Sequence, residues 1–209
     1  LMRPSLCEDA LRLGRMLAQL LPREPEVHGL VALMELQASR TGARIGAQGE
    51  PVLLLEQDRS RWDQLLIRRG LASLEHAAQL GNDIGSYALQ AAIAACHARA
   101  AVAEDTDWRR ITFLYGMLIS LSPSPVIELN RAVAMSMAFG PQAGLALVDR
   151  LRHDPALKGY HLLPTVRGDL LEKLGRIAEA REEFKRAATL TSNGRERRIL
   201  LERALRCEG

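Results

Sequence analysis

The sequence predicts an all-α protein, a right-handed stack of antiparallel helical hairpins. Hydrophobic residues make up 47% of the chain and aromatic residues only 4%, so leucine and alanine, the best helix formers, do most of the packing. Apolar side chains recur at helical spacing, as at Leu6, Ala10, Leu13 and Leu17. The stretch from His161 to Gly194 has the pattern of one helix-turn-helix repeat. Such a unit cannot bury its apolar face alone, so the rest of the chain is expected to stack against it.

The stretch from His161 to Gly194 matches the spacing of a tetratricopeptide repeat, whose period is about 34 residues. Gly168 would let two antiparallel helices approach closely, and Gly175 would end the first helix in a positive-φ conformation. Gly140 lies one period before Gly175 if one residue is inserted, which indicates a degenerate second repeat. An ordinary hairpin with a fortuitous pattern is the alternative. The remaining matching positions are Leu171, Ala180, Phe184 and Ala187.

Two regions are predicted. Residues 1–104 would form helical hairpins with an extended connection at about residues 41–59 that includes the apolar run Val52–Leu55. Residues 105–209 would form the tetratricopeptide-like repeats and a capping helix. Together the two regions are expected to make one continuous helical body.

Local signals place the helix ends. The first helix is expected from about Ser5 to Leu21, and an alanine-rich, central helix from Ser86 to about Ala103. Ser60 and Asp63 have the spacing of a capping box. Asp105 or Thr106 would cap the helix that contains Trp108. Asn193 and Glu196 would cap the last helix, whose arginines suit a solvated face: Arg195, Arg197, Arg198, Arg203 and Arg206.

Charge and cysteine content exclude several classes of protein. The net charge of +3 permits a nucleic-acid or acidic-protein partner but does not argue for either. Cys7, Cys96 and Cys207 are odd in number and widely spaced, so neither a disulfide scaffold nor a metal site is expected. No secretory segment or membrane-spanning run is found, which favours a cytoplasmic protein.

Catalytic motifs are absent from the sequence. It contains no glycine-rich phosphate loop, no GxSxG and no HExxH, so we expect neither an enzyme nor a cofactor. Two carboxylate pairs, Glu24 with Glu26 and Glu182 with Glu183, lie in turns or helices where solvated, structural roles are expected.

Seven residues are candidates for interaction with a partner. Trp62, among charged neighbours, could form an aromatic-cation surface, although a tryptophan at this place is more often part of a core. Asn130 lies in the middle of a helix and is expected to make a specific hydrogen bond, either to a neighbouring helix or to a ligand. His161 could instead serve packing or capping. The full set is Asp58, Arg59, Trp62, Asn130, Arg131, Tyr160 and His161.

Several segments together resemble a known family. They are Pro25–Met34, Gln57–Asp63, Leu89–Ala95, Ser122–Ala134 and Gly159–Pro164. In combination they are similar to the long C-terminal extension of a group of extracytoplasmic-function (ECF) RNA polymerase sigma factors. The resemblance covers the chain from Cys7 to the final helix.

The resemblance implies a regulatory, protein-interaction module of a bacterial transcription initiation factor. Its partners would be the sigma domains of the same parent chain, the RNA polymerase core and small YCII-related (DGPF-type) proteins. No promoter-melting helix or basic recognition helix is found here, so DNA would be contacted only through domains missing from this chain. The chain begins at Leu1 and is expected to be a fragment. A free-standing tetratricopeptide adaptor that binds a peptide or protein is the alternative.

Overall fold

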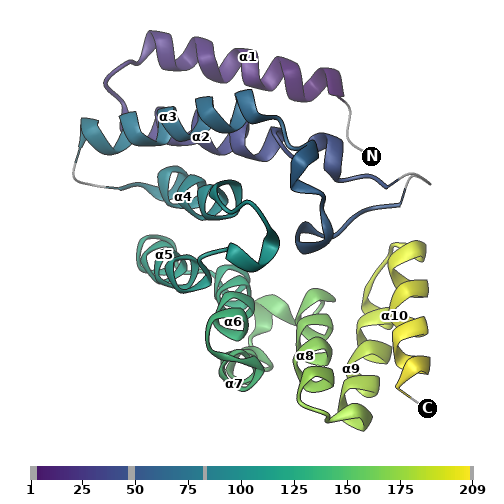
Figure 1. Cartoon of the computed structure of the whole chain (residues 1–209). Coiled ribbons are helices and arrows are strands. Elements are labelled where there is room, and N and C mark those ends of the chain that lie inside the picture. The colour runs from purple at the N-terminus through teal and green to yellow at the C-terminus, as the bar shows by residue number, and fades with distance from the viewer. Residues whose placement is uncertain (1–3, 47–49, 82–83, 208–209) are drawn as a thin grey trace. The chain divides into compact units, whose positions relative to one another are not determined.

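The computed structural model describes residues 4–46, 50–81 and 84–207 (Figure 1). In these ranges the chain is all-α, as predicted, with ten α-helices and no strand beyond an isolated antiparallel bridge between Ile45 and Pro51. The chain divides into two compact units. Unit 1 comprises Leu1–Arg110 with Ser120–Ser122, and unit 2 comprises Ile111–Ile119 with Pro123–Gly209, so the division runs through α5 (Trp108–Leu121).

Unit 1 is organised around α2. Its helices are α1 (Pro4–Leu20), α2 (Pro25–Ala38), α3 (Gln64–Leu80) and α4 (Ser86–Arg99), and α2 packs on the other three. The contact between α2 and α4 depends on Gly29, because a Cβ added there would lie 2.7 Å from the backbone nitrogen of Ala88. At this point only a glycine allows the two backbones to approach so closely.

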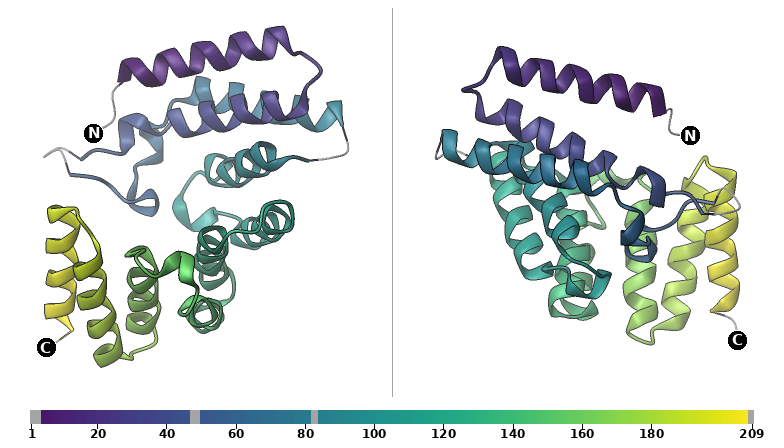
Figure 2. Two further views of the ribbon diagram at one scale, coloured as in Figure 1. Left: turned by 180° about the vertical axis from the view of Figure 1, so that it is seen from behind. Right: turned by 45° about the horizontal axis from the view of Figure 1, so that its top comes forward.

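The stripe of apolar residues that predicts α1 is not the stripe that packs on α2. Leu6 and Leu13 are 58% and 57% exposed. The side of α1 toward α2 carries Gly14, which is buried and where an added Cβ would lie 3.2 Å from the sulfur of Met34. Figure 2 shows α1 running alongside α2 in both views. α1 therefore has two apolar sides, and only one of them is covered.

The capping box predicted at the start of α3 is correct for Asp63 and wrong for Ser60. Asp63 is the N-cap residue, and its carboxylate accepts hydrogen bonds from two amides of the first turn at 2.8 and 3.0 Å. The Ser60 hydroxyl donates instead to the Asp58 carboxylate at 2.6 Å. The connection before it is non-helical in part, as expected, but it includes the short 3-10 helices Leu54–Glu56 and Arg59–Arg61, and Leu53 is 68% exposed.

The alanine-rich helix α4 is buried, although it is shorter than expected, ending at Arg99. Leu89, Ala91 and Ala95 have no exposed surface. The cap predicted for the following helix is also wrong, since the amide of Arg110 donates to the Asp107 carboxylate at 2.9 Å. Asp107 was not the expected residue because neighbouring polar side chains compete for the same role.

Unit 2 continues from α5 as a series of short helices. They are α6 (Pro125–Phe139), α7 (Pro141–Leu151), α8 (Leu162–Lys173), α9 (Ile177–Leu190) and α10 (Gly194–Arg206), and from α6 onward each helix packs on the next. Gly168 permits the close approach that was predicted, because an added Cβ would lie 2.5 Å from the Phe184 ring. Gly175 ends α8 with φ 73°, and Gly140 separates α6 from α7 with φ 94°.

The last helix begins at the predicted cap. The Asn193 side chain accepts hydrogen bonds from the amides of Arg195 and Glu196. The expectation that all five arginines lie on a solvated face is wrong for Arg203. Its guanidinium lies 4.1 Å from the centroid of the buried Phe184 ring and forms ion pairs with Asp169 and Glu172 of α8. Arg203 thus ties α10 to the core of unit 2.

Candidate interaction sites

Arg59 is buried and caps the C-terminal end of α4. Its guanidinium donates to the carbonyl oxygens of His97 at 2.8 Å and Ala100 at 2.7 Å, and to the Thr106 hydroxyl oxygen at 3.0 Å. The last carbonyl groups of a helix have no partner within the helix, and a positive charge there is also favoured by the helix dipole. Both terminal nitrogens of the Arg59 guanidinium therefore donate hydrogen bonds to groups of unit 1 itself.

Trp62 is a core residue, only 3% exposed. The guanidinium carbons of Arg59 and Arg40 lie 5.2 Å and 5.8 Å from the centroid of its ring, within the range of cation–π attraction. The aromatic-cation arrangement expected from the sequence therefore exists, but it faces inward. Burial, together with the nearby Arg44, lowers the pKa of Arg40 to about 10.

Asp58 is exposed and forms a local turn. Its carboxylate accepts hydrogen bonds from the Ser60 hydroxyl and, at 3.0 Å, from the Ser60 amide. These two bonds lower the pKa of Asp58. Asp58 therefore shapes the segment that carries Arg59.

His97 lies in the last turn of α4 beside this cluster. Burial, and then the positive charges of Arg40 and Arg59, lower its pKa to about 4. Its ring stands edge-on to the ring of Trp108, with centroids 5.2 Å apart. At neutral pH His97 is consequently an uncharged packing residue.

The N-terminal end of α4 is held by Glu26, a residue of α2. Its carboxylate accepts hydrogen bonds from the amides of Tyr87 at 3.0 Å and Ala88 at 3.1 Å. The expectation that Glu26 is simply solvated is therefore wrong, although its role is structural. Three of the segments that carry the family resemblance contact α4 or form part of it: Pro25–Met34 supplies Glu26 and Gly29, Gln57–Asp63 supplies Arg59 at the other end, and Leu89–Ala95 is part of α4 itself.

Asn130 and Arg131 lie on α6 in unit 2. Asn130 is exposed, and within the described residues its side chain has no hydrogen-bond partner, so the expected bond to a neighbouring helix is absent. Arg131 makes a long ion pair with Glu128 at 3.5 Å, one turn earlier on the same helix. Asn130 is thus available to solvent.

Tyr160 and His161 precede α8. Tyr160 is partly buried against the core of unit 2. His161 Nε2 lies 3.3 Å from Oε2 of Glu196 in the first turn of α10, and the same oxygen accepts a hydrogen bond from the Thr191 hydroxyl at 2.8 Å. His161 therefore links the beginning of α8 to the beginning of α10. This is a structural role, in line with the packing or capping expected as the alternative to partner binding.

A buried charge network in unit 2 was not anticipated. Arg167 of α8, 7% exposed, donates to Asp149 of α7 and to Glu183 of α9, both at 2.8 Å. Glu183 is buried, so the expectation of a solvated pair with Glu182 is wrong for this residue. In the sequence, this network is indicated only by an arginine, Arg167, inside an apolar stretch. That position does not show which carboxylates Arg167 binds.

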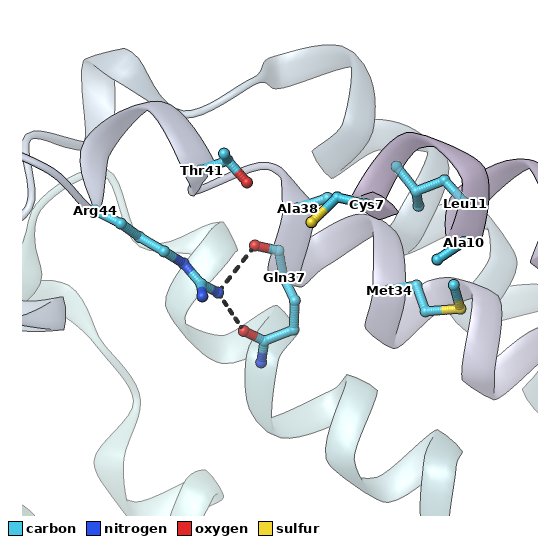
Figure 3. A pocket seen from close by; sticks show the side chains of 8 residues that line it. All are labelled: Cys7, Ala10, Leu11, Met34, Gln37, Ala38, Thr41 and Arg44. Carbon is cyan, nitrogen blue, oxygen red and sulfur yellow. Dashed lines mark hydrogen bonds between the residues drawn. The ribbon is translucent and has the colours of Figure 1, made fainter. Parts of the chain in front are cut away.

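A small apolar hollow lies between α1 and α2 (Figure 3). Its polar wall is formed by Arg44, which donates to the carbonyl oxygen of Gln37 at 3.2 Å and to the Gln37 side chain at 2.9 Å. Cys7 lies at the hollow as a free thiol. Among the residues that the structure describes, no group of histidine, cysteine and carboxylate side chains could hold a metal ion, and no helix has the length and apolar character needed to cross a membrane.

The candidate residues therefore do not form one site. Asp58, Arg59 and Trp62 belong to the cluster at the C-terminal end of α4 in unit 1. Within unit 2, Asn130 and Arg131 lie on α6, Tyr160 packs against the core, and His161 contacts Glu196 of α10.

Comparison with known proteins finds one family model similar to the N-terminal part of the chain and one longer relative similar to most of it. Residues 1–78 match the model described as "Family of unknown function (DUF6596)". An uncharacterized protein of Rhizobium meliloti (strain 1021) is 49% identical over 191 residues. That match covers 91% of this chain but 44% of the relative, so the chain spans less than half the length of that protein. No solved structure matches the chain.

Proposed function

We propose that this chain is the regulatory, protein-interaction C-terminal module of a bacterial ECF RNA polymerase sigma factor. The observation that carries the proposal is the meeting of three resemblance segments around α4. Glu26 and Arg59 bind opposite ends of that helix, and Gly29 allows its close approach to α2. The three segments lie far apart in the sequence, but all of them build or hold α4. We expect this of a domain shared with the sigma-factor family, and not of short matches that arise by chance.

We further propose that unit 2 is a right-handed, tetratricopeptide-like stack. Three buried positions of the α6–α7 hairpin precede their counterparts in the α8–α9 hairpin by 36 residues: Ala132 and Gly168, Gly144 and Ala180, Val148 and Phe184. Gly140 and Gly175, both with positive φ, stand at the turns of the two hairpins. The period is slightly longer than the usual value of about 34 residues. Stacked hairpins of this kind offer extended surfaces for protein partners.

The length of the relative supports a multidomain parent protein. More than half of the Rhizobium meliloti protein lies outside the region matched by this chain. That length is sufficient for further domains of ordinary size, such as the two sigma domains that bind polymerase and read the promoter. In this proposal DNA is contacted only by those domains, in the cytoplasm, where RNA polymerase works.

Control would operate through contacts of the module. The module would bind the sigma domains of its own parent chain or the polymerase core, and its occupancy by a partner, such as a small YCII-related (DGPF-type) protein, would decide whether promoter binding is productive. This hypothesis requires no catalytic residue and no cofactor.

The proposal is tested by mixing this chain with the separately expressed sigma domains of its parent factor. We expect a complex by isothermal titration calorimetry and a change in promoter-dependent transcription. Sigma domains of an ECF factor without such an extension are the matched control and should not bind. The second candidate, a free-standing peptide-binding adaptor, is favoured by the stacked hairpins of unit 2. It predicts that the chain binds peptide ligands and has no effect on the sigma domains.

A further inference from the structure

A cavity of about 410 Å³ lies at the C-terminal end of α4, within unit 1. One part of its wall comes from the segment before α3 and includes Arg59 and Trp62, and Ile67 of α3 adds an apolar side chain. The rest comes from the end of α4 and the residues that follow it, 98–101. The volume is in the usual range of small-molecule sites, roughly 300–1,000 Å³.

Arg59 brings a positive charge to this cavity without a carboxylate partner. Its terminal nitrogens donate to two carbonyl oxygens and a hydroxyl oxygen, all of which are neutral. Glu104 and Asp105 act on the pKa of Arg59 only through space, and neither of them lines the cavity. A buried charge without a counter-charge is costly, so an anion bound beside Arg59 would stabilise it.

Other cations lie near the same residues. The guanidinium of Arg40 lies close to the Trp62 ring and donates to the side-chain oxygen of Gln37, again a neutral acceptor. The pKa of His97 is lowered by burial and further by the charges of Arg40 and Arg59, so the positive potential extends to its ring. Arg99 is an exposed cation at the cavity itself. The surroundings of the cavity are therefore positive.

Two hydrogen-bond donors of the cavity residues have no acceptor. Nε of Arg59 and Nε1 of Trp62 are buried and make no hydrogen bond within the described part of the chain. The residues that carry them are 8% and 3% exposed. Buried polar groups are nearly always hydrogen-bonded, so two unpaired donors at one cavity indicate a place for an acceptor. No carboxylate of the described residues lines the cavity, so a ligand has to supply that acceptor.

We propose that this cavity binds a small organic anion, with its carboxylate or phosphate group near Arg59 and Arg99 and its apolar part against Trp62 and Ile67. An oxyanion supplies both the negative charge that the arginines lack and several acceptor lone pairs, and hydrogen bonds between charged groups are the stronger ones. The indole ring gives a flat, apolar wall for a planar ligand. This inference goes beyond the proposed function and does not depend on it.

The fluorescence of Trp62 measures binding. The chain has two tryptophans, so Trp108→Phe leaves Trp62 as the only source of the signal. Titration with benzoate or phenyl phosphate should change its emission and saturate, with a Kd below about 1 mM for the better anion. Benzamide, which has the same ring without the charge, should bind about tenfold more weakly or worse. The better of the two anions shows which oxyanion the cavity prefers. No saturable change with either anion, or equal binding of benzamide, overturns the proposal.

Substitutions at the cavity test where the anion binds. Arg99→Gln removes an exposed charge and should raise the Kd of the better anion about threefold or more, with unchanged circular dichroism. Arg69→Gln, at an exposed arginine of α3 that does not line the cavity, is the control and should leave the Kd as it is. Trp62→Phe keeps a ring but removes the Nε1 donor, and calorimetry should show weaker binding. The Arg99→Gln result decides the question if Trp62→Phe destabilises the chain: an unchanged Kd in Arg99→Gln contradicts the inference.

Discussion

Glu26 and Arg59 hold opposite ends of the same helix, α4. The Glu26 carboxylate accepts hydrogen bonds from amides of its first turn, and the Arg59 guanidinium donates to carbonyl oxygens at its end. Each side chain satisfies backbone groups that the helix itself leaves without partners, and each has the charge that the helix dipole favours at that end. The stability of unit 1 should therefore depend on both residues.

Replacement of Arg59 should destabilise the chain strongly. We expect Arg59→Ala to lower the free energy of unfolding by about 2 to 4 kcal/mol, because it leaves one buried carbonyl group, one partly buried carbonyl group and the buried Thr106 hydroxyl without their donor. Arg59→Lys should retain only part of the stability that Arg59→Ala loses. A lysine ammonium group cannot donate hydrogen bonds in the forked geometry of the guanidinium. Urea unfolding measures both values. Arg69→Ala, an exposed arginine of α3, is the control and should change little.

Glu26 should contribute less than Arg59 to the free energy of unfolding. Glu26→Gln removes the charge and part of the acceptor capacity at the start of α4, and we expect a loss of about 1 kcal/mol, the usual value of a helix cap. The exposed Glu24→Gln is the matched control, two residues away. Equal effects of the two substitutions in urea unfolding would refute the capping role.

His97 should make stability depend on pH. Its pKa in the folded chain is about 4, below its ordinary value near 6.5, so below pH 6.5 the unfolded chain binds the proton more readily than the folded chain. Stability should be highest above pH 6.5 and fall by about 2 to 4 kcal/mol as the pH drops to 4. His97→Gln should flatten this part of the profile when unfolding is measured at several pH values. An unchanged slope in the variant would assign the pH dependence to other groups.

Gly168 should not tolerate a side chain. The Cβ of Gly168→Ala would meet the Phe184 ring at 2.5 Å, and we expect a loss of about 1 to 3 kcal/mol from overpacking. The control is Gly159→Ala, where nothing lies within 4 Å of the added carbon. Adding Phe184→Leu to Gly168→Ala should cost less than the sum of the two single substitutions, because the smaller side chain removes the clash. Full additivity in thermal unfolding would contradict this packing.

The all-α class and several details were predictable from the sequence because they depend on local spacing. Gly175 ends its helix with positive φ, and Gly168 meets a neighbouring helix, as the repeat pattern requires. The helix caps are Asp63 and Asp107, whereas the sequence also favours Ser60 for the first and favours Asp105 or Thr106 for the second. Several serine, threonine and aspartate side chains stand close together there, and packing of the surrounding chain decides which of them caps the helix.

The roles of charged residues were less predictable because their partners are distant in sequence. Arg59 was singled out, but the carbonyl group it binds belongs to His97, 38 residues later. Arg203 was expected in solvent with the other arginines of α10. It lies instead over the Phe184 ring, which only the packing of α9 against α10 brings near. The pattern along one helix does not show which charges a neighbouring helix will cover.

We propose that this chain controls a sigma factor in cis, and transcription in vitro measures that control. The parent factor would be assayed at its own promoter with and without the region that corresponds to residues 1–209. We expect deletion to change transcript yield severalfold, up if the module inhibits and down if it activates, and polymerase binding or promoter opening to change with it. Unchanged transcription by the shortened factor, with the promoter and polymerase held constant, would contradict this proposal.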